Sequence, residues 1–262
     1  MGPVLTLGRY VFAVTIAGFG VQHIVSAALG GALAPGPPWI AGNALLAGAF
    51  GGTLLVTGVG IASTEQPFIP AAVLGVALFV YDALFYFPGI VTHVRDPSNW
   101  TRGSEVLAMS GVAFVIAGSA GVPDVRWPRV QYRVAAIGLL LFAVSVFVWA
   151  AQHFIYARFT ATIVPVWIPW RLFWAVFVGA AFLAASLAFA IRVQSRLAAT
   201  LLGILFLAIV LVVHVPRVSA NPSSGREWTS ALVALVMCGA SFAVAESRPL
   251  ADGVARGAMG LG

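Results

Sequence analysis

Two stretches of the chain, FAVTIAGFGVQH at residues 12–23 and FAVSVFVWAAQH at residues 142–153, follow the same pattern. Each begins with Phe-Ala-Val and ends with Gln-His, and nearly all residues between are apolar. Self-similarity at a long, fixed separation is typical of a duplicated structural unit. The sequence therefore predicts two tandem copies of one unit of roughly 120–130 residues.

The similarity continues on the C-terminal side of both stretches. Trp39-Ile40 follows the first Gln-His pair, and Trp167-Ile168 follows the second. Two histidines and one glutamate recur in the same order: His23, His93 and Glu105 in the first copy, and His153, His214 and Glu227 in the second. Because the glutamate follows the later histidine by twelve residues in one copy and by thirteen in the other, we interpret these six residues as one repeated set.

Composition indicates the class of protein. The chain is 61% hydrophobic and 8% charged, and its mean hydropathy is +1.00. Runs of about 20 apolar residues can cross a bilayer core as helices, and the sequence lacks the ten-residue alternation of a transmembrane barrel. We predict an all-α polytopic membrane protein with eight transmembrane helices in two tandem four-helix bundles. The predicted helices cover residues 8–29, 39–61, 70–92, 105–121, 134–156, 167–191, 197–214 and 229–246.

The segment between the two copies contains prolines and arginines, which end one helix and delay the next. We expect a first repeat at residues 1–121, a linker at 122–133, a second repeat at 134–246 and an unpatterned tail at 247–262. Pro88 falls inside the third predicted helix and should kink it. The first helix is too long for the core of a signal peptide, so we expect it to be retained.

The distribution of charge bears on partners and topology. The net charge is +6, and all fourteen basic residues are arginines spread through the loops. This is not the clustered patch of a nucleic-acid-binding protein, so no nucleic acid is expected as a partner. An even number of helices places both termini on one side, which carries the larger share of the arginines. The positive-inside rule then predicts cytoplasmic termini, and we expect a multi-pass protein of a prokaryotic cytoplasmic membrane with the lipid bilayer as a partner.

The repeated polar residues are expected at one membrane face. The first and third helices of each copy end at the face where the fourth begins, and the set stands near those ends. Two imidazoles and a carboxylate are suitable ligands for Fe, Cu or Zn, and two histidines alone can hold haem b from both sides. The metal-site candidates are His23, His93, Glu105, His153, His214 and Glu227, and the cofactor-contacting candidates are Gln22 and Gln152.

A plainer interpretation is that these polar helix ends meet lipid head groups or water. Duplication of all three positions favours function, because ionisable groups within a bilayer are costly and are functional candidates by default. Asp82 in the third helix and Arg171 at the head of the sixth break the repeat. Either they pair across the repeats, or Arg171 reaches the interface while Asp82 is protonated or bonded to Tyr81 or Tyr86.

Each copy resembles the DoxX/DoxD-like membrane protein family. The resemblance rests on the four-helix length, the glycine-rich second helix beginning Gly42-Asn43-Ala44-Leu45-Leu46-Ala47-Gly48, the histidine ending the third helix, and Glu105-Val106-Leu107-Ala108 opening the fourth. It covers nearly the whole chain and implies four-helix bundles linked to redox or quinone-coupled complexes. The acidic residue expected in the second helix of many members is Asn43 here and Arg171 in the second copy, which departs from that pattern.

We therefore expect a membrane redox protein with one metal or haem b site per repeat. A quinone is a further cofactor candidate, and a soluble or membrane redox protein is the expected partner. The sequence assigns no catalytic residue. A non-catalytic subunit that anchors or assembles a larger complex is the alternative, and a small-solute transporter is a third interpretation that the parallel orientation of the repeats disfavours.

Overall fold

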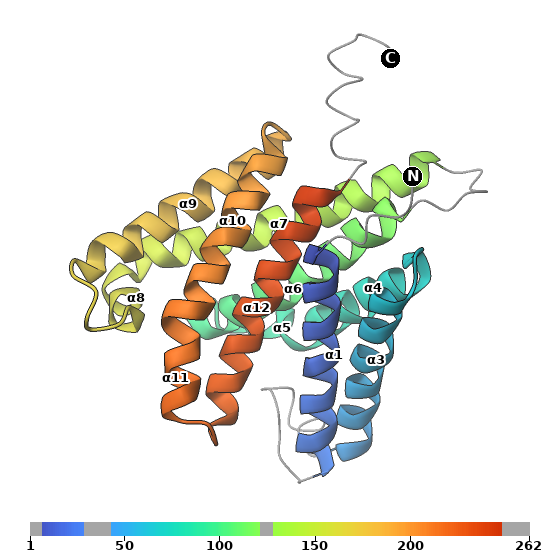
Figure 1. Ribbon diagram of the computed structural model, residues 1–262, viewed down its shortest axis with the longest axis horizontal. Helices are drawn as coiled ribbons and strands as arrows, with labels where there is room; N and C mark the ends of the chain where they lie inside the picture. Colours follow the sequence, from blue (N-terminus) through green and yellow to red (C-terminus); the bar gives the residue numbers. More distant parts are fainter. Residues whose placement is uncertain (1–6, 29–42, 121–127, 248–262) are drawn as a thin grey trace.

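The computed structural model describes residues 7–28, 43–120 and 128–247, and every regular element in these ranges is helical. The elements are α1 (Leu7–Ala28), α3 (Ala44–Ser63), α4 (Phe68–Phe85), α5 (Phe87–Thr92), α6 (Pro97–Ser119), α7 (Pro128–Ile155), α8 (Ala157–Ile163), α9 (Arg171–Ile191), α10 (Ser195–Ile209), the π-helical segment η1 (Val210–His214), α11 (Val215–Ala220) and α12 (Gly225–Glu246). Figure 1 shows their arrangement. The predicted all-α class is confirmed for the described residues.

Six helical segments among the described residues are long and apolar enough to cross a membrane. They are Ala44–Ser63, Phe68–Thr92, Arg129–Ile155, Arg171–Ile191, Ser195–Ala220 and Gly225–Glu246. The other two long helices carry charged residues within their length: Arg9 in α1, and Arg102 and Glu105 in α6. Length and composition therefore support six of the eight spans that the sequence predicts.

The long helical segments pack in a closed order. Starting from α1, each contacts the next in the order α3, α4, α6, α7, α9, α10 and α12, and α12 returns to α1. The first half of the chain, α1 to α6, therefore meets the second half, α7 to α12, along two main seams, α6 against α7 and α12 against α1, and α6 also contacts α12. In Figure 1 the second seam runs through the front of the molecule, where α1 and α12 lie side by side.

Glycines bring the helix backbones close together at both seams. A Cβ atom built on Gly111 of α6 would lie 2.6 Å from the carbonyl oxygen of Gly138 in α7. At the other seam, a Cβ atom on Gly239 of α12 would lie 2.9 Å from Phe12 Cα in α1. Small residues permit such approach in membranes, where packing contributes most of the association between helices. The glycines thus hold the two halves together at backbone distance.

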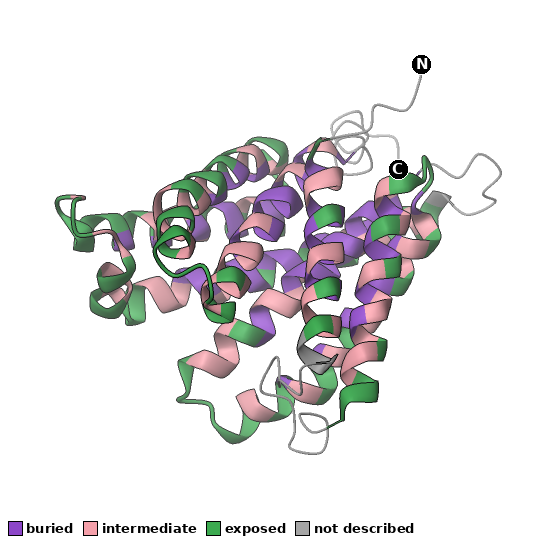
Figure 2. Ribbon diagram, turned by 60° about the horizontal axis from the view of Figure 1, so that its bottom comes forward, coloured by how far each residue is buried: buried purple, intermediate pink, exposed green. Residues whose placement is uncertain are grey.

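The core lies along these seams, and the apolar residues that face outward surround it. Phe12 and Phe142, which open the two repeated stretches, are both fully buried. Figure 2 shows the buried residues concentrated on the inward sides of the helices, with exposed residues outside. Many exposed side chains are large and apolar, such as Leu45 and Val56. Such an exterior suits lipid and supports a bilayer as the environment of the protein.

α6 and α12 begin earlier than the sequence predicted. α6 begins at Pro97 and α12 at Gly225, after the N-cap residues Asp96 and Ser224. The Asp96 carboxylate accepts a hydrogen bond from the backbone N–H of Ser98 at 2.9 Å. Such a side chain satisfies an N–H group that has no partner within the first turn, so it fixes where the helix starts. The hydropathy pattern missed both starts because the first turns are polar.

Replacing Asp96 by alanine should destabilise the start of α6 and remove a pH dependence. The Ser98 hydroxyl and backbone N–H donate to the Asp96 carboxylate and hold its pKa below its ordinary value. The stabilisation is therefore present above the unfolded-state pKa and is lost as the pH falls through the lower folded-state pKa. Thermal unfolding in mild detergent, measured from neutral to acidic pH, tests this expectation.

Asp96→Asn is the matched control for that measurement, because an amide oxygen can still cap a helix but does not titrate. It should keep most of the stability of the unsubstituted protein at neutral pH. It should also lose the part of the acid dependence that comes from this carboxylate. If the unsubstituted protein and both variants lose the same stability on acidification, Asp96 does not have this role.

Prolines interrupt the third helix of each half. α4 ends at Phe85 and α5 begins at Phe87, with Pro88 in the first turn of α5. In the second half, α10 passes through η1 into α11, whose first turn contains Pro216. Proline lacks an N–H group and its ring crowds the carbonyl four residues earlier, so an α-helix rarely continues unchanged through it. Where a kink at Pro88 was predicted, the helix divides into α4 and α5, and a π-helical irregularity precedes Pro216.

Several contacts of the first half recur in the second half 128 residues later. The indole N–H of Trp100 donates to the carbonyl of Val94 at 2.9 Å, and that of Trp228 donates to the carbonyl of Pro222 at 2.9 Å. Gly75 and Gly203 form a second pair, because each packs against a phenylalanine ring of the fourth helix of its half. Gly51 and Gly179 form a third pair, because each packs against the Cβ atom of a histidine. These contacts define a common register for the second to fourth helices of the two halves.

This register corrects the sequence-based pairing of the repeated polar residues. The counterparts are Asn221 for His93, Tyr86 for His214, Val233 for Glu105 and Asn99 for Glu227. His93 and Asn221 end α5 and α11 alike, since each donates its backbone N–H to the carbonyl four residues earlier, at 2.9 and 3.1 Å. The sequence comparison matched identical residue types whose places in the helices differ. Only His23 and His153 occupy equivalent places.

Candidate functional site

A cavity of about 1720 Å³ lies between the two halves, at the end of the molecule where α6 and α12 begin. Most of its lining is apolar. Six titratable side chains in its wall bear on function: His23, Tyr81, Tyr86, Glu105, His153 and His214. A large apolar cavity with a few polar groups is the usual form of a site for a small amphiphilic molecule.

His23 and His153 are held in the same orientation by their own helices. His23 Nδ1 lies 2.9 Å from the Phe19 carbonyl oxygen, and His153 Nδ1 lies 2.8 Å from the Trp149 carbonyl oxygen. A carbonyl can only accept, so Nδ1 of each neutral ring carries the proton and Nε2 keeps its lone pair. Each ring therefore has an Nε2 atom available to accept a hydrogen bond or to bind a metal.

Glycines and phenylalanines of the second helix of each half position these two rings. A Cβ atom on the neighbouring glycine would lie 2.9 Å from His23 Cβ and 2.8 Å from His153 Cβ, so no larger residue fits there without displacement. A phenylalanine meets each ring edge-on, with ring centroids 5.5 Å apart for His23 and 5.1 Å for His153. These neighbours are Gly51 and Phe50 in α3, and Gly179 and Phe182 in α9.

Gln22 and Gln152 join the halves next to the histidines. Gln22 Nε2 donates to Thr229 Oγ1 of α12 at 2.6 Å. Gln152 Nε2 donates to Thr101 Oγ1 of α6 at 3.0 Å and to the Pro97 carbonyl at 2.9 Å. Both glutamines also line the cavity. Their amide groups therefore connect α1 to α12 and α7 to α6, and contact with a cofactor stays a prediction.

Glu105 and His214 also line the cavity. Neither is structurally equivalent to the residue with which the sequence paired it, which is Glu227 for Glu105 and His93 for His214. Glu105 lies within α6, well after its start at Pro97, and is half-buried. His214 ends the π-helical segment η1, and its Nδ1 atom is buried without a hydrogen-bond partner among the described residues. π-Helical segments occur frequently at functional sites, and an unsatisfied buried nitrogen marks a place where a ligand or water can bind.

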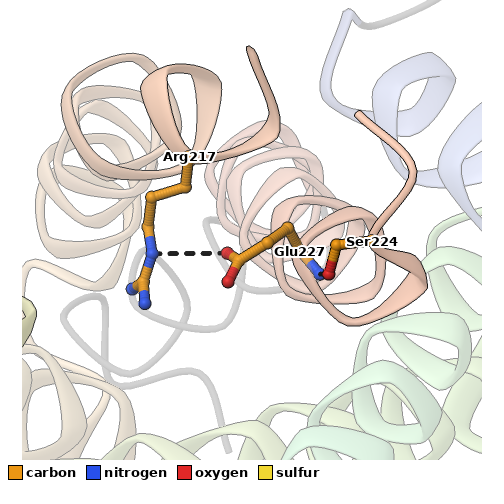
Figure 3. A network of polar contacts seen from close by, with 3 residues as sticks. All are labelled: Arg217, Ser224 and Glu227. Carbon is orange, nitrogen blue, oxygen red and sulfur yellow. Dashed lines mark hydrogen bonds and ion pairs between the residues drawn. The ribbon is translucent and has the colours of Figure 1, made fainter. Parts of the chain in front are cut away.

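His93 and Glu227 lie outside the cavity wall. His93 is exposed, and its Nδ1 atom lies 2.9 Å from the hydroxyl of its neighbour Thr92. Glu227 Oε2 lies 3.3 Å from Arg217 Nε, and the Ser224 hydroxyl caps the first turn by accepting from the Glu227 N–H at 3.4 Å, as Figure 3 shows. Glu227 therefore joins α11 to the start of α12, where a negative charge is favourable.

The two His/His/Glu sets predicted from the sequence are not gathered around common points. Among the described residues, no three His, Cys, Asp or Glu side chains come together as a metal-binding group. Four of the six candidates line the shared cavity instead: His23, Glu105, His153 and His214. The arrangement is thus one chamber with polar residues from both halves, and metal or haem binding stays a prediction.

Asp82 is a buried carboxyl for which the sequence left two alternatives, an ion pair with Arg171 or a carboxyl that is protonated or bonded to a tyrosine. The ion pair found among the described residues is Arg217 with Glu227 instead. Asp82 Oδ1 is buried and has no hydrogen-bond partner among the described residues. Its side chain faces α6 at Gly103, where a Cβ atom would lie 3.3 Å from Oδ1. The glycine leaves room for the carboxyl between α4 and α6.

Two further features of the cavity were not predicted. α8 and the segment up to Trp170 contribute apolar residues to the wall between α7 and α9. Trp167 and Trp170 of this segment are largely exposed, as aromatic residues at a bilayer interface are. Trp149 is instead buried in the cavity wall, where its indole N–H donates to Ser104 Oγ at 2.8 Å. The helical spacing of Trp149 and His153 on one face of α7 was the available sequence signal.

No protein-family model, curated protein or solved structure matches this chain. The functional assignment therefore depends on the chemistry of the cavity.

Proposed function

We propose that the chain is an eight-span membrane protein built from two fused copies of a four-helix unit of the DoxX/DoxD-like type. Two observations support the duplication. Contacts recur 128 residues apart, and the first helix of each half packs against the fourth helix of the other half, α1 against α12 and α7 against α6. α1 and α6 are its remaining two spans, and their charged residues face the interior or the helix ends. The excess of arginine on the side of the termini supports cytoplasmic termini, in a prokaryotic cytoplasmic membrane.

We propose that the cavity between the halves binds a quinol-type ligand drawn from the bilayer, so that the protein acts in a membrane redox system. The observation that carries this proposal is that His23 and His153 line one apolar cavity with their Nε2 atoms free to accept. A quinol has two hydroxyl groups that donate hydrogen bonds and an apolar ring and tail. Its chemistry therefore complements both the acceptors and the lining.

The oxidised form of such a ligand has partners in the same cavity. A quinone has carbonyl oxygens that only accept hydrogen bonds, and the hydroxyl groups of Tyr81 and Tyr86 can donate them. A cavity of about 1720 Å³ has room for a ring with a long tail, because pockets for drug-sized molecules measure roughly 300–1,000 Å³. A soluble or membrane redox protein would exchange electrons with the bound ligand.

Haem b is the second candidate, and the free Nε2 atoms favour it. A metal-binding histidine commonly donates its other nitrogen to a backbone carbonyl, which is the arrangement of both His23 and His153. A single Fe, Cu or Zn ion per repeat has less support, because His93 and Glu227 lie away from the cavity. The non-catalytic anchor is the remaining alternative.

Purification in mild detergent distinguishes these functions. The protein is extracted with organic solvent for quinone analysis, and its visible spectrum and metal content are recorded. We expect bound quinone near one molecule per chain, or saturable binding of an added short-chain quinol measured by tryptophan fluorescence. A haem absorption band, or stoichiometric metal, would replace the quinol proposal by the corresponding cofactor. Absence of all three would favour the anchoring subunit.

A further inference from the structure

The two walls of the cavity differ in chemistry. The wall formed by α4 and α6 contains Tyr81, Tyr86 and Glu105. The ring of Tyr81 stacks on Phe50 with centroids 4.3 Å apart and meets the ring of Tyr86 edge-on at 5.7 Å. Tyr86 is 6% exposed, so its ring is fixed by packing. This wall, which we call the polar wall, has two hydroxyl groups and a carboxyl group on a rigid aromatic support.

The opposite wall, formed by α10, η1 and α12, is apolar at two of the three equivalent positions, and the third is His214. Its further polar residues, Arg226, Thr229 and Ser230, stand in the first two turns of α12. Its apolar part consists of Phe206, Ile209, Val213 and Val233. In the register of the recurring contacts, Ile209 is the counterpart of Tyr81 and Val233 is the counterpart of Glu105. Because these positions have the same place in each half, the difference comes from residue type and not from depth in the fold. We call the surface of Phe206, Ile209, Val213 and Val233 the apolar wall.

The asymmetry extends behind the polar wall. Asp82 adjoins Tyr81 in α4, and its counterpart in the second half is Val210. Asp82 Oδ1 has no hydrogen-bond partner among the described residues, although it is buried. Such a group costs free energy unless water or a ligand satisfies it. Tyr81, Asp82 and Glu105 therefore have apolar counterparts in the second half, whereas the counterpart of Tyr86 is His214.

We propose that the cavity binds its ligand in one orientation, with the oxygen-bearing head group against Tyr81, Tyr86 and Glu105 and the alkyl tail against the apolar wall. This proposal rests on the quinol function proposed above and specifies it. The tyrosine hydroxyls can donate to the head-group oxygens and the Glu105 carboxyl is a further hydrogen-bonding group beside them, and the tail covers apolar surface. The reverse orientation leaves the carboxyl and hydroxyl groups facing alkyl chain, where they lose their hydrogen bonds.

Binding of a series of quinols with tails of increasing length tests the orientation. The ligands share one head group and range from the tail-less hydroquinone to a ten-carbon chain, and affinity is measured by tryptophan fluorescence in detergent. Tyr81→Phe removes one head-group donor, and Glu105→Val copies the residue of the other half. Each should weaken all members of the series by a similar factor of about five- to tenfold. Ile209→Ala should instead reduce the gain in affinity with tail length.

The outcomes separate this proposal from the function on which it rests. If the unsubstituted protein binds no member of the series, both proposals fail. If it binds the series, but Ile209→Ala weakens the tail-less ligand as much as Glu105→Val does, the function stands and the orientation is wrong. Glu105→Gln, which keeps the shape and a hydrogen-bonding group, controls for misfolding. It should retain more affinity than Glu105→Val at an equal unfolding temperature.

Discussion

Replacing Gly138 by leucine should prevent the two halves from packing at the seam between α6 and α7. A Cβ atom at this position would contact the carbonyl oxygen of Gly111 and lie 2.8 Å from the backbone nitrogen of Val115. Both neighbours are backbone atoms in regular helix, so neither can move without shifting the whole of α6. Overpacking a core commonly costs about 1–3 kcal/mol and sometimes more, and a rigid backbone neighbour places this substitution at the upper end.

Gly48→Leu is the matched control for this prediction. It makes the same change of residue in a helix, but nothing lies within 4 Å of the position that a Cβ atom would take. Unfolding of both variants by titration with a denaturing detergent, followed by circular dichroism, measures the difference. We expect Gly138→Leu to unfold at a clearly lower denaturant fraction. Equal midpoints for the two variants would show that this seam does not have the close approach described.

Replacing both His23 and His153 by leucine should reduce quinol affinity by roughly 25- to 100-fold. Each substitution removes one hydrogen-bond acceptor from the cavity, and a single hydrogen bond contributes about 1 kcal/mol, or close to a factor of five to ten. His93→Leu is the control, because His93 is exposed and lies outside the cavity wall. It should bind quinol as the unsubstituted protein does. An unchanged affinity in the double variant would remove the two histidines from the site.

The sequence predicted the helical class and the repeated Gln-His pair because both depend on local patterns. Phe12 and Phe142 recur at equivalent places, and the structure buries both completely. His23 and His153 recur with the same backbone hydrogen bond, since that bond depends only on their own helix. Features determined within one helix were therefore accessible from the residues alone.

The alignment of the two fourth helices, α6 and α12, was predicted incorrectly, because it was based on one matching residue type. Identical glutamates were matched, although Glu105 and Glu227 stand at different distances from the start of α6 and α12. Trp100-Thr101 and Trp228-Thr229 were the better markers, because each tryptophan and threonine makes the same contacts in both halves. The N-cap residues would have indicated the true helix starts.

The cavity itself could not be predicted from local patterns. It depends on α1 packing against α12 and α6 against α7, so that each half meets the other at two seams. The sequence suggested a separate site within each repeat, whereas the structure brings His23 and His153 to one chamber. Only tertiary packing determines which helices are neighbours, and helices of similar hydropathy do not specify it.

Nitrogen-15 NMR of the four histidines tests the central claim most directly. We expect two imidazoles, assigned to His23 and His153 by their loss in the leucine variants, to be neutral with the proton on Nδ1. Addition of a short-chain quinol should shift the unprotonated Nε2 signals of both rings as they accept hydrogen bonds, while the His93 signals stay unchanged. If His23 and His153 carry the proton on Nε2, or if saturating quinol leaves both Nε2 signals in place, the cavity does not bind quinol through these histidines.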